Sequence, residues 1–301
     1  MLTRLAITAI ILTLLARGID MGASAQAIAA IDLRYLALVL GLVAIDRGVM
    51  IWRWILLLRS SGIAIGTAAA ARLFLVSSFV GSFLPAGVGA DAARAYGLAR
   101  ENTSGSEALA SVAVDRLLGV MSIVLMASIG VVVWKPAQAD SRPIWLIAVL
   151  LAACVMFFWS NMLTRQLTPA RFHDHPLLRR VFRLSDALGR YRGRQAVLVQ
   201  VMAWSIAVQL LRITQAYFLG LGLGMSVPYA YYLLFMPVGL LMLLLPISIS
   251  GFGLPQGVIV WLLRPMGAPD SQSFALSTLI ILTGLAGNLP GLVLWLRDRR
   301  A

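Results

Sequence analysis

Two Asp–Arg pairs stand inside long apolar stretches of this sequence, Asp46 with Arg47 and Asp115 with Arg116. A charged side chain inside a membrane span costs about 2.5 to 3.5 kcal/mol on insertion scales, so each one needs a partner or a function. Arginine suits phosphate, because its planar guanidinium forms two charge-assisted hydrogen bonds and stays protonated. The pairs therefore favour either an anion-binding interior or internal ion pairs that fix helix register, and the sequence leaves both open.

Further polar residues fall where helical faces would meet these pairs. Arg53 follows Asp46 by seven residues, which is two helical turns, so both lie on one stripe. Ser205, Gln209 and Arg212 repeat at helical spacing in another apolar stretch. We expect these side chains to line a polar interior together with the two Asp–Arg pairs.

Proline and glycine interrupt two apolar stretches, at residues 82–91 and 245–255. In hydrocarbon a freed backbone N–H or C=O finds no water, so a broken helix is tolerated only where it is buried in protein or lines a polar cavity. One break in each half of the chain is typical of a carrier, whose substrate site lies where two broken helices meet.

The first break predicts an anion site at the tip of a re-entrant hairpin, where the returning half-helix presents free N–H groups and the positive end of its dipole. A headgroup would approach the backbone around Pro85, Gly87 and Gly89. Asp91 could cap the returning helix, and Arg94 follows three residues later. The alternative is a proline-kinked packing site where small residues let helices approach closely.

The second break predicts a similar site at the start of another returning helix. Its hydroxyl, amide and backbone N–H groups come from Ser248, Ser250, Gly251, Gly253 and Gln256. The alternative is a helix that is only kinked by its prolines. That alternative accounts for the two prolines, whereas the serines and glycines between them favour an anion site.

The composition is that of a membrane protein, since 60% of the residues are apolar and only 12% are charged. Soluble domains carry about 25% charged residues. The net charge of +13, with Lys135 as the single lysine, would indicate nucleic acid in a soluble chain. Here it indicates membrane orientation and contact with anionic lipid, so we expect no nucleic-acid partner. The lone Cys154 excludes an internal disulfide.

The positions of arginine determine the predicted topology. Residues 161–194 hold eight arginines against two aspartates and are expected in the cytoplasm. Eight full crossings would conflict with that rule, whereas six full crossings and two re-entrant hairpins, at the third and seventh apolar windows, satisfy it. The eight windows fall at residues 3–16, 35–58, 68–84, 107–134, 143–160, 195–218, 228–247 and 272–296.

The predicted fold is therefore an all-α, polytopic transmembrane bundle that forms a single domain over residues 1–301, with both termini in the cytoplasm. The N-terminal stretch imitates a signal peptide, but Arg17 and Asp20 precede the apparent cleavage site, so a retained span is favoured. From Pro176 onward, residues 161–194 contain an amphipathic pattern that favours an interfacial helix. The alternative is a solvated loop whose arginines only set topology.

Signals for an enzyme are weak. His173 and His175 have no further ligands at metal-binding spacing, and the chain contains neither a P-loop nor a G-x-S-x-G motif. We expect no metal, no cofactor and no enzymatic activity.

Three motifs resemble, in order and spacing, the family of the lysyl-phosphatidylglycerol synthase membrane domain, a flippase-like domain. The first runs from Phe83 to Arg94, the second from Ser111 to Gly119, and the third from Pro246 to Gly253. The resemblance covers nearly the whole chain. Alanines 86 and 90 stand where the family usually has glycine, and Gln256 stands where the family commonly has glutamate. The missing carboxylate weighs against a proton-coupled or cation-binding role.

The resemblance implies an integral membrane protein that turns a lipid with a polar headgroup from one leaflet to the other. Taken together with the arginines, it leads us to expect a protein of the cell (inner) membrane that moves an anionic phospholipid, a glycolipid or a polyprenyl-phosphate-linked lipid. Arg94, Arg116 and Arg212 would hold the headgroup phosphate, with Asp91 and Asp115 orienting the arginines. Membrane lipids with anionic headgroups are the expected partners, together with a lipid-synthesis enzyme. Two other functions stay open, namely a membrane transferase acting on a lipid-linked substrate and a non-transporting partner of an envelope-lipid enzyme.

Overall fold

A computed structural model describes residues 18–84, 89–101, 103–134, 189, 191, 193–244 and 253–298 of the chain. Within these residues the chain is helical and contains no strand, which confirms the predicted all-α class. The helices, in order, are α2 (Met21–Ala29), α3 (Leu33–Ser60), α4 (Thr67–Gly81), α5 (Gly89–Ala99), α6 (Gly105–Val133), α9 (Gln195–Gly222), α10 (Tyr229–Leu244), α11 (Leu254–Leu263), the short 3₁₀ helix η3 (Arg264–Met266), α12 (Asp270–Ala286) and α13 (Leu289–Asp298).

Four helical segments in the described part of the chain are long and apolar enough to cross a membrane. They are α3, α6, α9, and α12 together with α13, which jointly cover Asp270–Arg297. These segments correspond to the second, fourth, sixth and eighth predicted windows, so a membrane-embedded protein is confirmed. The first and fifth windows and nearly all of the predicted amphipathic segment lie outside the described residues. The total of six crossings therefore stays a prediction.

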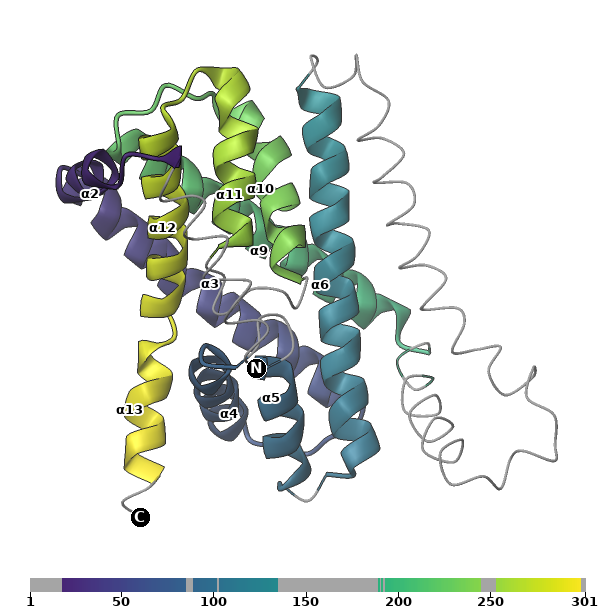
Figure 1. Ribbon diagram of the computed structural model, residues 1–301. Coiled ribbons are helices and arrows are strands. Elements are labelled where there is room, and N and C mark those ends of the chain that lie inside the picture. Colours follow the sequence, from purple (N-terminus) through teal and green to yellow (C-terminus); the bar gives the residue numbers. More distant parts are fainter. Residues whose placement is uncertain are drawn as a thin grey trace, which may run out of the picture.

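The third and seventh windows contain shorter helices, α4 with 15 residues and α10 with 16. Figure 1 shows α4 with α5 in the lower half of the molecule and α10 with α11 in the upper half, and each pair packs together. The two breaks that join the partners, at residues 85–88 and 245–252, lie outside the described residues. Opposed re-entrant hairpins accordingly stay a prediction.

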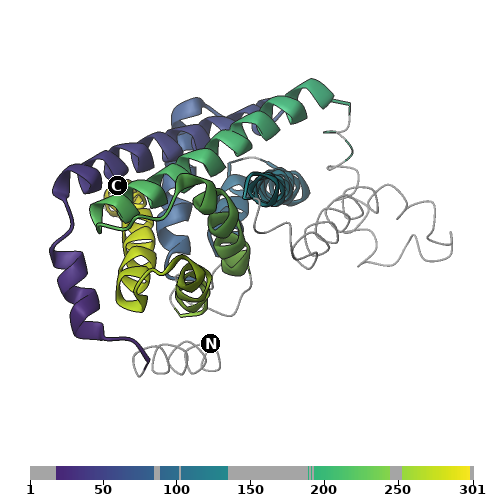
Figure 2. The same cartoon turned by 90° about the horizontal axis from the view of Figure 1, so that it is seen from above.

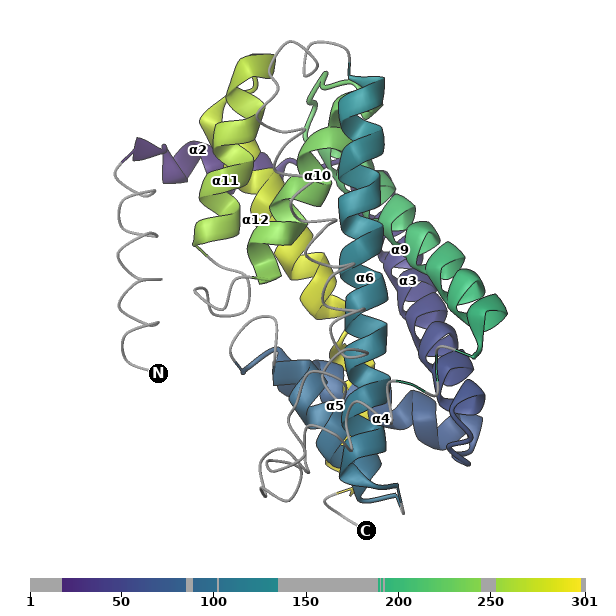
Figure 3. The ribbon, with the colours of Figure 1, turned by 90° about the vertical axis from the view of Figure 1, so that its right-hand side faces the viewer.

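The most extensive helix contact joins α3 to α9, which lie side by side in Figures 2 and 3. Helix α6 packs against α5, α9 and α10. Because the first Asp–Arg pair lies on α3, the second on α6 and Arg212 on α9, this packing brings the predicted polar faces into one interior.

Side-chain caps fix where two of the site-bearing helices begin. The Oδ1 atom of Asp32 accepts the Arg34 N–H at 2.9 Å before α3, and the Oγ atom of Ser104 accepts the Glu107 N–H at 3.3 Å before α6. Each cap satisfies one of the four N–H groups that a helix start leaves without a partner. The caps thereby help set the register at which the charged pairs enter the bundle.

Gly130 allows α6 and α10 to pack closely. A Cβ atom at this position would overlap the carbonyl group of Leu233. Only glycine therefore lets the two backbones approach this far. The apolar cluster around this crossing includes the buried side chains of Phe235, Tyr232 and Met126.

The eighth window was predicted as one apolar stretch, but the structure divides it between α12 and α13. Pro290 has no backbone N–H and cannot continue the hydrogen-bond ladder of α12. Gly287, at the break, lies against Val43 and Arg47 of α3. The break brings the Gly284 carbonyl within reach of α3 and the Asn288 side chain within reach of α4.

The arginines near helix ends form two groups, one at each end of the molecule. Arg59 lies in the last turn of α3, Arg297 in the last turn of α13, and Arg100 directly follows α5; these ends lie at the bottom of Figure 1. Arg34, at the start of α3, and Arg264, after α11, lie toward the top. This separation agrees with the predicted sidedness, while the assignment of the lower end to the cytoplasm stays a prediction.

Candidate functional site

A cavity of about 420 Å³ lies between the helices that carry the charged pairs. Its walls come from α3, α4, α5, α6, α9, α10 and α12. The charged side chains that line it are Asp46, Arg47, Arg53, Asp91, Arg94, Asp115, Arg116 and Arg212. The structure therefore brings together charged residues that are up to 166 positions apart in the sequence, as the helical spacing predicted.

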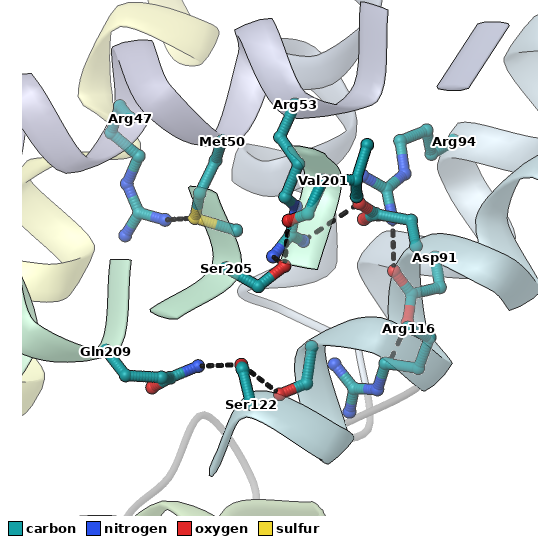
Figure 4. Close-up of polar contacts among 12 residues, drawn as sticks. Arg47, Met50, Arg53, Asp91, Arg94, Arg116, Ser122, Val201, Ser205 and Gln209 are labelled. Atoms are coloured by element: carbon teal, nitrogen blue, oxygen red, sulfur yellow. Dashed lines mark hydrogen bonds and ion pairs between the residues drawn. The ribbon is translucent and has the colours of Figure 1, made fainter. Parts of the chain in front are cut away.

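One group of lining residues is a chain of ion pairs that we call the Asp115 network: Arg53, Arg94, Arg116, Asp91 and Asp115. Asp115 pairs with Arg53 at 2.8 Å and with Arg94 at 3.1 Å. Asp91 then pairs with Arg94 at 2.8 Å and, more distantly, with Arg116 at 3.6 Å. Figure 4 shows Arg94, Asp91 and Arg116 in this series.

Two arginines of the Asp115 network, Arg53 and Arg94, are buried and held by protein groups on several sides. Arg94 lies over the rings of Trp54 and Phe74, with its guanidinium carbon 5.1 Å from each ring centroid. Arg53 donates to the Ser205 hydroxyl at 3.0 Å. Both arginines are buried, so their charges are balanced inside the protein. Arg116 differs, because 41% of its side chain is exposed and its ion-pair distance to Asp91, 3.6 Å, is long.

The other group, the Asp46 network, consists of Asp46, Arg47, Met50 and Arg212. The Asp46 carboxylate is 3.3 Å from Nε of Arg212 and 3.9 Å from Nη1 of Arg47. Both arginines also approach the Met50 sulfur, Arg212 at 3.1 Å and Arg47 at 3.7 Å. A thioether is only a weak acceptor, so these guanidiniums keep donor capacity for a better one.

The charges of the cavity do not balance. Of the described residues, five arginines and three aspartates line it. Each network contains one more arginine than aspartate, so the lining has two surplus positive charges. The segments between α4 and α5 and between α10 and α11 contain no acidic residue that could offset them. The arrangement can therefore stabilise an anion such as a phosphate group.

Two amide side chains of the lining residues are held by serine hydroxyls. Gln209 is buried, with an exposed fraction of 2%, and its Nε2 atom donates to the Ser122 hydroxyl at 3.2 Å (Figure 4). Its Oε1 atom has no hydrogen-bond partner among the described residues. The same holds for Oδ1 of Asn288, whose Nδ2 atom donates to the Ser82 hydroxyl at 2.9 Å.

Six of the thirteen predicted site residues fall at the cavity or beside it. Asp91, Arg94, Asp115, Arg116 and Arg212 line it. Gly89 begins α5, and a Cβ atom there would overlap the side chain of Leu84, so the chain on either side of the first break is closely packed.

Of the other seven predicted residues, two are described and do not line the cavity. Gly253 has a φ of +97°, a conformation that favours glycine, and its N–H donates to Oε1 of Gln256 at 3.1 Å. The Gln256 amide nitrogen donates to the Thr278 hydroxyl at 2.9 Å, so Gln256 joins α11 to α12 and does not line the cavity. Outside the described residues lie Pro85, Gly87, Ser248, Ser250 and Gly251.

Sequence reasoning missed Gln215, Asn288 and the role of Met50. Gln215 lines the cavity three residues after Arg212, and the helical spacing that identified Arg212 would have found it. Asn288 carries no such signal, because it reaches the cavity only through the break between α12 and α13. No group of three or more metal-ligating side chains occurs among the described residues, and His173 and His175 lie outside them.

In the comparison with known families, the family model described as "Lysylphosphatidylglycerol synthase TM region" matches residues 1–291 of the chain. No curated protein matches the chain. The match spans every element that lines the cavity.

Proposed function

This chain belongs to the family described as the lysylphosphatidylglycerol synthase TM region, and from that premise we propose that it moves a lipid with an anionic headgroup from one membrane leaflet to the other. The lipid is a phospholipid, a glycolipid or a polyprenyl-phosphate-linked lipid. Its headgroup enters the cavity while its acyl or prenyl chains stay in the surrounding bilayer.

The observation that carries this proposal is the surplus of two arginines in a cavity surrounded by membrane-spanning helices. Buried ion pairs that only fixed helix register would need equal numbers of arginines and aspartates. An unbalanced guanidinium in a membrane interior is costly, and a phosphate group supplies the missing negative charge.

Two arginines are in a position to exchange partners during binding. Arg116 is 3.6 Å from Asp91 and is the most exposed charged side chain of the Asp115 network. Arg212 has 26% of its side chain exposed and shares its donors between Asp46 and the Met50 sulfur. A phosphate oxygen would replace the long ion pair at Arg116 and the weak sulfur acceptor at Arg212. Arg94 acts differently, because its two carboxylate partners hold it as a fixed positive charge near the site.

The same geometry favours translocation over a transferase that uses an aspartate as its base. Each of the three cavity aspartates lies within 4 Å of an arginine, so its carboxylate is already held by a guanidinium and is not free to accept a substrate proton. Lipid extracts separate the two functions, because a transferase creates or removes a lipid species whereas a translocase changes only its leaflet.

The test uses purified protein in liposomes that contain an anionic phospholipid with a fluorescent acyl chain, and follows the loss of inner-leaflet fluorescence after dithionite is added. We expect Arg116→Ala to abolish protein-dependent loss while the protein still folds. Arg100→Ala is the matched control, because Arg100 is exposed, stacks on Tyr96 and does not line the cavity. Normal turnover in Arg116→Ala would remove the role proposed for this residue.

A further inference from the structure

We propose that Asp46 and Arg47 transmit the binding of a headgroup phosphate at Arg212 to the break between α12 and α13, so that α13 moves when the cavity is occupied. This inference rests on the proposed function and makes Asp46 and Arg47 positioning residues for it. Two features of the structure lead to it: a backbone carbonyl that the break frees, and a buried carboxylate that two arginines share.

The freed carbonyl belongs to Gly284 and is satisfied by Arg47. In a continuous helix the Asn288 N–H would donate to the Gly284 carbonyl, four residues earlier. It donates instead to the Leu285 carbonyl at 2.9 Å, and Nη2 of Arg47 donates to Gly284 at 3.0 Å. A carbonyl freed within a membrane span needs a new donor. The geometry of the break therefore depends on where the Arg47 guanidinium lies.

The shared carboxylate is that of Asp46, which neither arginine binds closely. Its Oδ1 atom is 3.3 Å from Nε of Arg212, and its Oδ2 atom is 3.9 Å from Nη1 of Arg47. The exposed fraction of Asp46 is 3%, and Oδ1 has no hydrogen-bond partner among the described residues. A buried carboxylate needs a cation beside it. Asp46 therefore moves toward whichever of the two guanidiniums is not otherwise engaged.

A bound phosphate competes with Asp46 for Arg212. Arginine binds phosphate best through two parallel N–H groups, and Nε with Nη2 forms one such edge. On Arg212 this edge holds Asp46 through Nε and the Met50 sulfur through Nη2. A phosphate on the edge replaces both, and its charge repels the carboxylate strongly where water is excluded. Asp46 then closes the 3.9 Å distance to its other partner, Arg47.

Closing that distance disturbs the break. The guanidinium of Arg47 is planar and moves as one piece, with Nη1 toward Asp46 and Nη2 on the Gly284 carbonyl. A shift of Nη1 toward Asp46 consequently displaces Nη2 from its present position at Gly284. The carbonyl must follow Arg47 or lose its donor, and either change alters the angle between α12 and α13.

Helix α13 passes this movement to the cavity wall formed by α4, against which it packs (Figure 1). A Cβ atom at Gly291 would overlap the Leu75 carbonyl, so the two helix backbones are in direct contact. In addition, Nδ2 of Asn288 donates to the hydroxyl of Ser82, which lines the cavity. Helix α4 therefore moves with α13, and the cavity changes shape as the headgroup binds.

The experiment measures the distance between two spin labels by pulsed electron paramagnetic resonance. With Cys154 replaced by serine, the labels are attached at Val293→Cys on α13 and Val199→Cys on α9, because both positions are exposed and neither lines the cavity. The protein is measured in a maltoside detergent, which carries no phosphate, before and after addition of short-chain phosphatidylglycerol. We expect the lipid to populate a second distance that is absent in detergent alone.

Two variants of the doubly labelled protein test the route. Asp46→Asn keeps the side-chain size but removes the charge that recruits Arg47, so phosphatidylglycerol should no longer produce the second distance. Arg47→Met removes the donor to Gly284, so the second distance should be populated without lipid, and this variant tests the route even if Asp46→Asn does not fold. Arg59→Met is the matched control, because Arg59 lies on the same helix, is exposed and does not line the cavity.

The outcomes separate this inference from the function on which it rests. A single distance under all conditions, in protein that moves lipid in the dithionite assay, would overturn the inference and leave the proposed function intact. An unaltered lipid response in Asp46→Asn would overturn the route through the carboxylate. Folded protein that neither moves lipid nor changes its label distance would contradict both.

Discussion

At the scale of single residues, Asp115 is the centre of the site. Its two carboxylate oxygens hold two buried arginines that come from different helices, Arg53 from α3 and Arg94 from α5. The sequence indicated that Asp115 needed a partner, because a charge inside an apolar stretch is costly. It did not indicate which arginine, since Arg53 and Arg94 are equally plausible until the packing of α3 and α5 against α6 is known.

Replacing Asp115 should therefore destabilise the protein strongly. Asp115→Asn removes a charge that two buried guanidiniums share, and breaking a buried ion pair by removing one partner costs about 3 to 5 kcal/mol. Asp270→Asn is the matched control, because the Asp270–Arg264 pair is solvent-exposed and such pairs contribute little to stability. Thermal unfolding in detergent measures both. Similar losses in the two variants would show that Asp115 is not the structural centre assigned to it.

At the scale of helices, apolar windows predicted the existence of α3, α6, α9 and α12 because a spanning helix needs about 20 apolar residues. They did not predict the break between α12 and α13, although Pro290 was the signal for it. They also extended the third window to residue 84, whereas α4 ends at Gly81. The close approach of helices was less predictable still, because the contact between Gly130 and Leu233 depends on which helices are neighbours.

The crossing of α6 and α10 should depend on Gly130. In Gly130→Ala the new methyl group overlaps backbone atoms of Leu233 and Leu234, which cannot move aside as a flexible side chain would. Overpacking of this kind typically costs about 1 to 3 kcal/mol. The control is Gly41→Ala on α3, where an added Cβ meets nothing within 4 Å, so no loss is expected. The midpoint of thermal unfolding in detergent is the measurement, and an unchanged midpoint in Gly130→Ala would contradict this description of the crossing.

At the scale of the whole molecule, charged residues from four helices meet in one cavity. The arginines near helix ends form two groups, one at each end of the molecule. The excess of arginine on the cytoplasmic side of membrane proteins predicted the two groups of arginines. The helical spacing of the charged residues predicted that they would line one interior. The sequence analysis assigned Gln256 to the same site because this residue follows the second break. In the structure, Gln256 instead caps the start of α11 by accepting the Gly253 N–H. The cavity is therefore a property of the packing of all these helices, and a single motif does not define it.

The central claim is that lipid headgroups pass through this cavity, and blocking the cavity tests it. With Cys154 replaced by serine, Ser78→Cys places a single thiol on the cavity lining. Ser128→Cys is the matched control, because both serines are half-buried, both donate to the carbonyl four residues earlier, and Ser128 does not line the cavity.

The measurement is the rate of dithionite bleaching of labelled phosphatidylglycerol in liposomes, before and after reaction with a bulky membrane-permeant maleimide. We predict that modification of Ser78→Cys stops protein-dependent bleaching and that modification of Ser128→Cys leaves it unchanged. Unchanged bleaching after complete modification of Ser78→Cys would contradict the claim that lipid headgroups pass through the cavity.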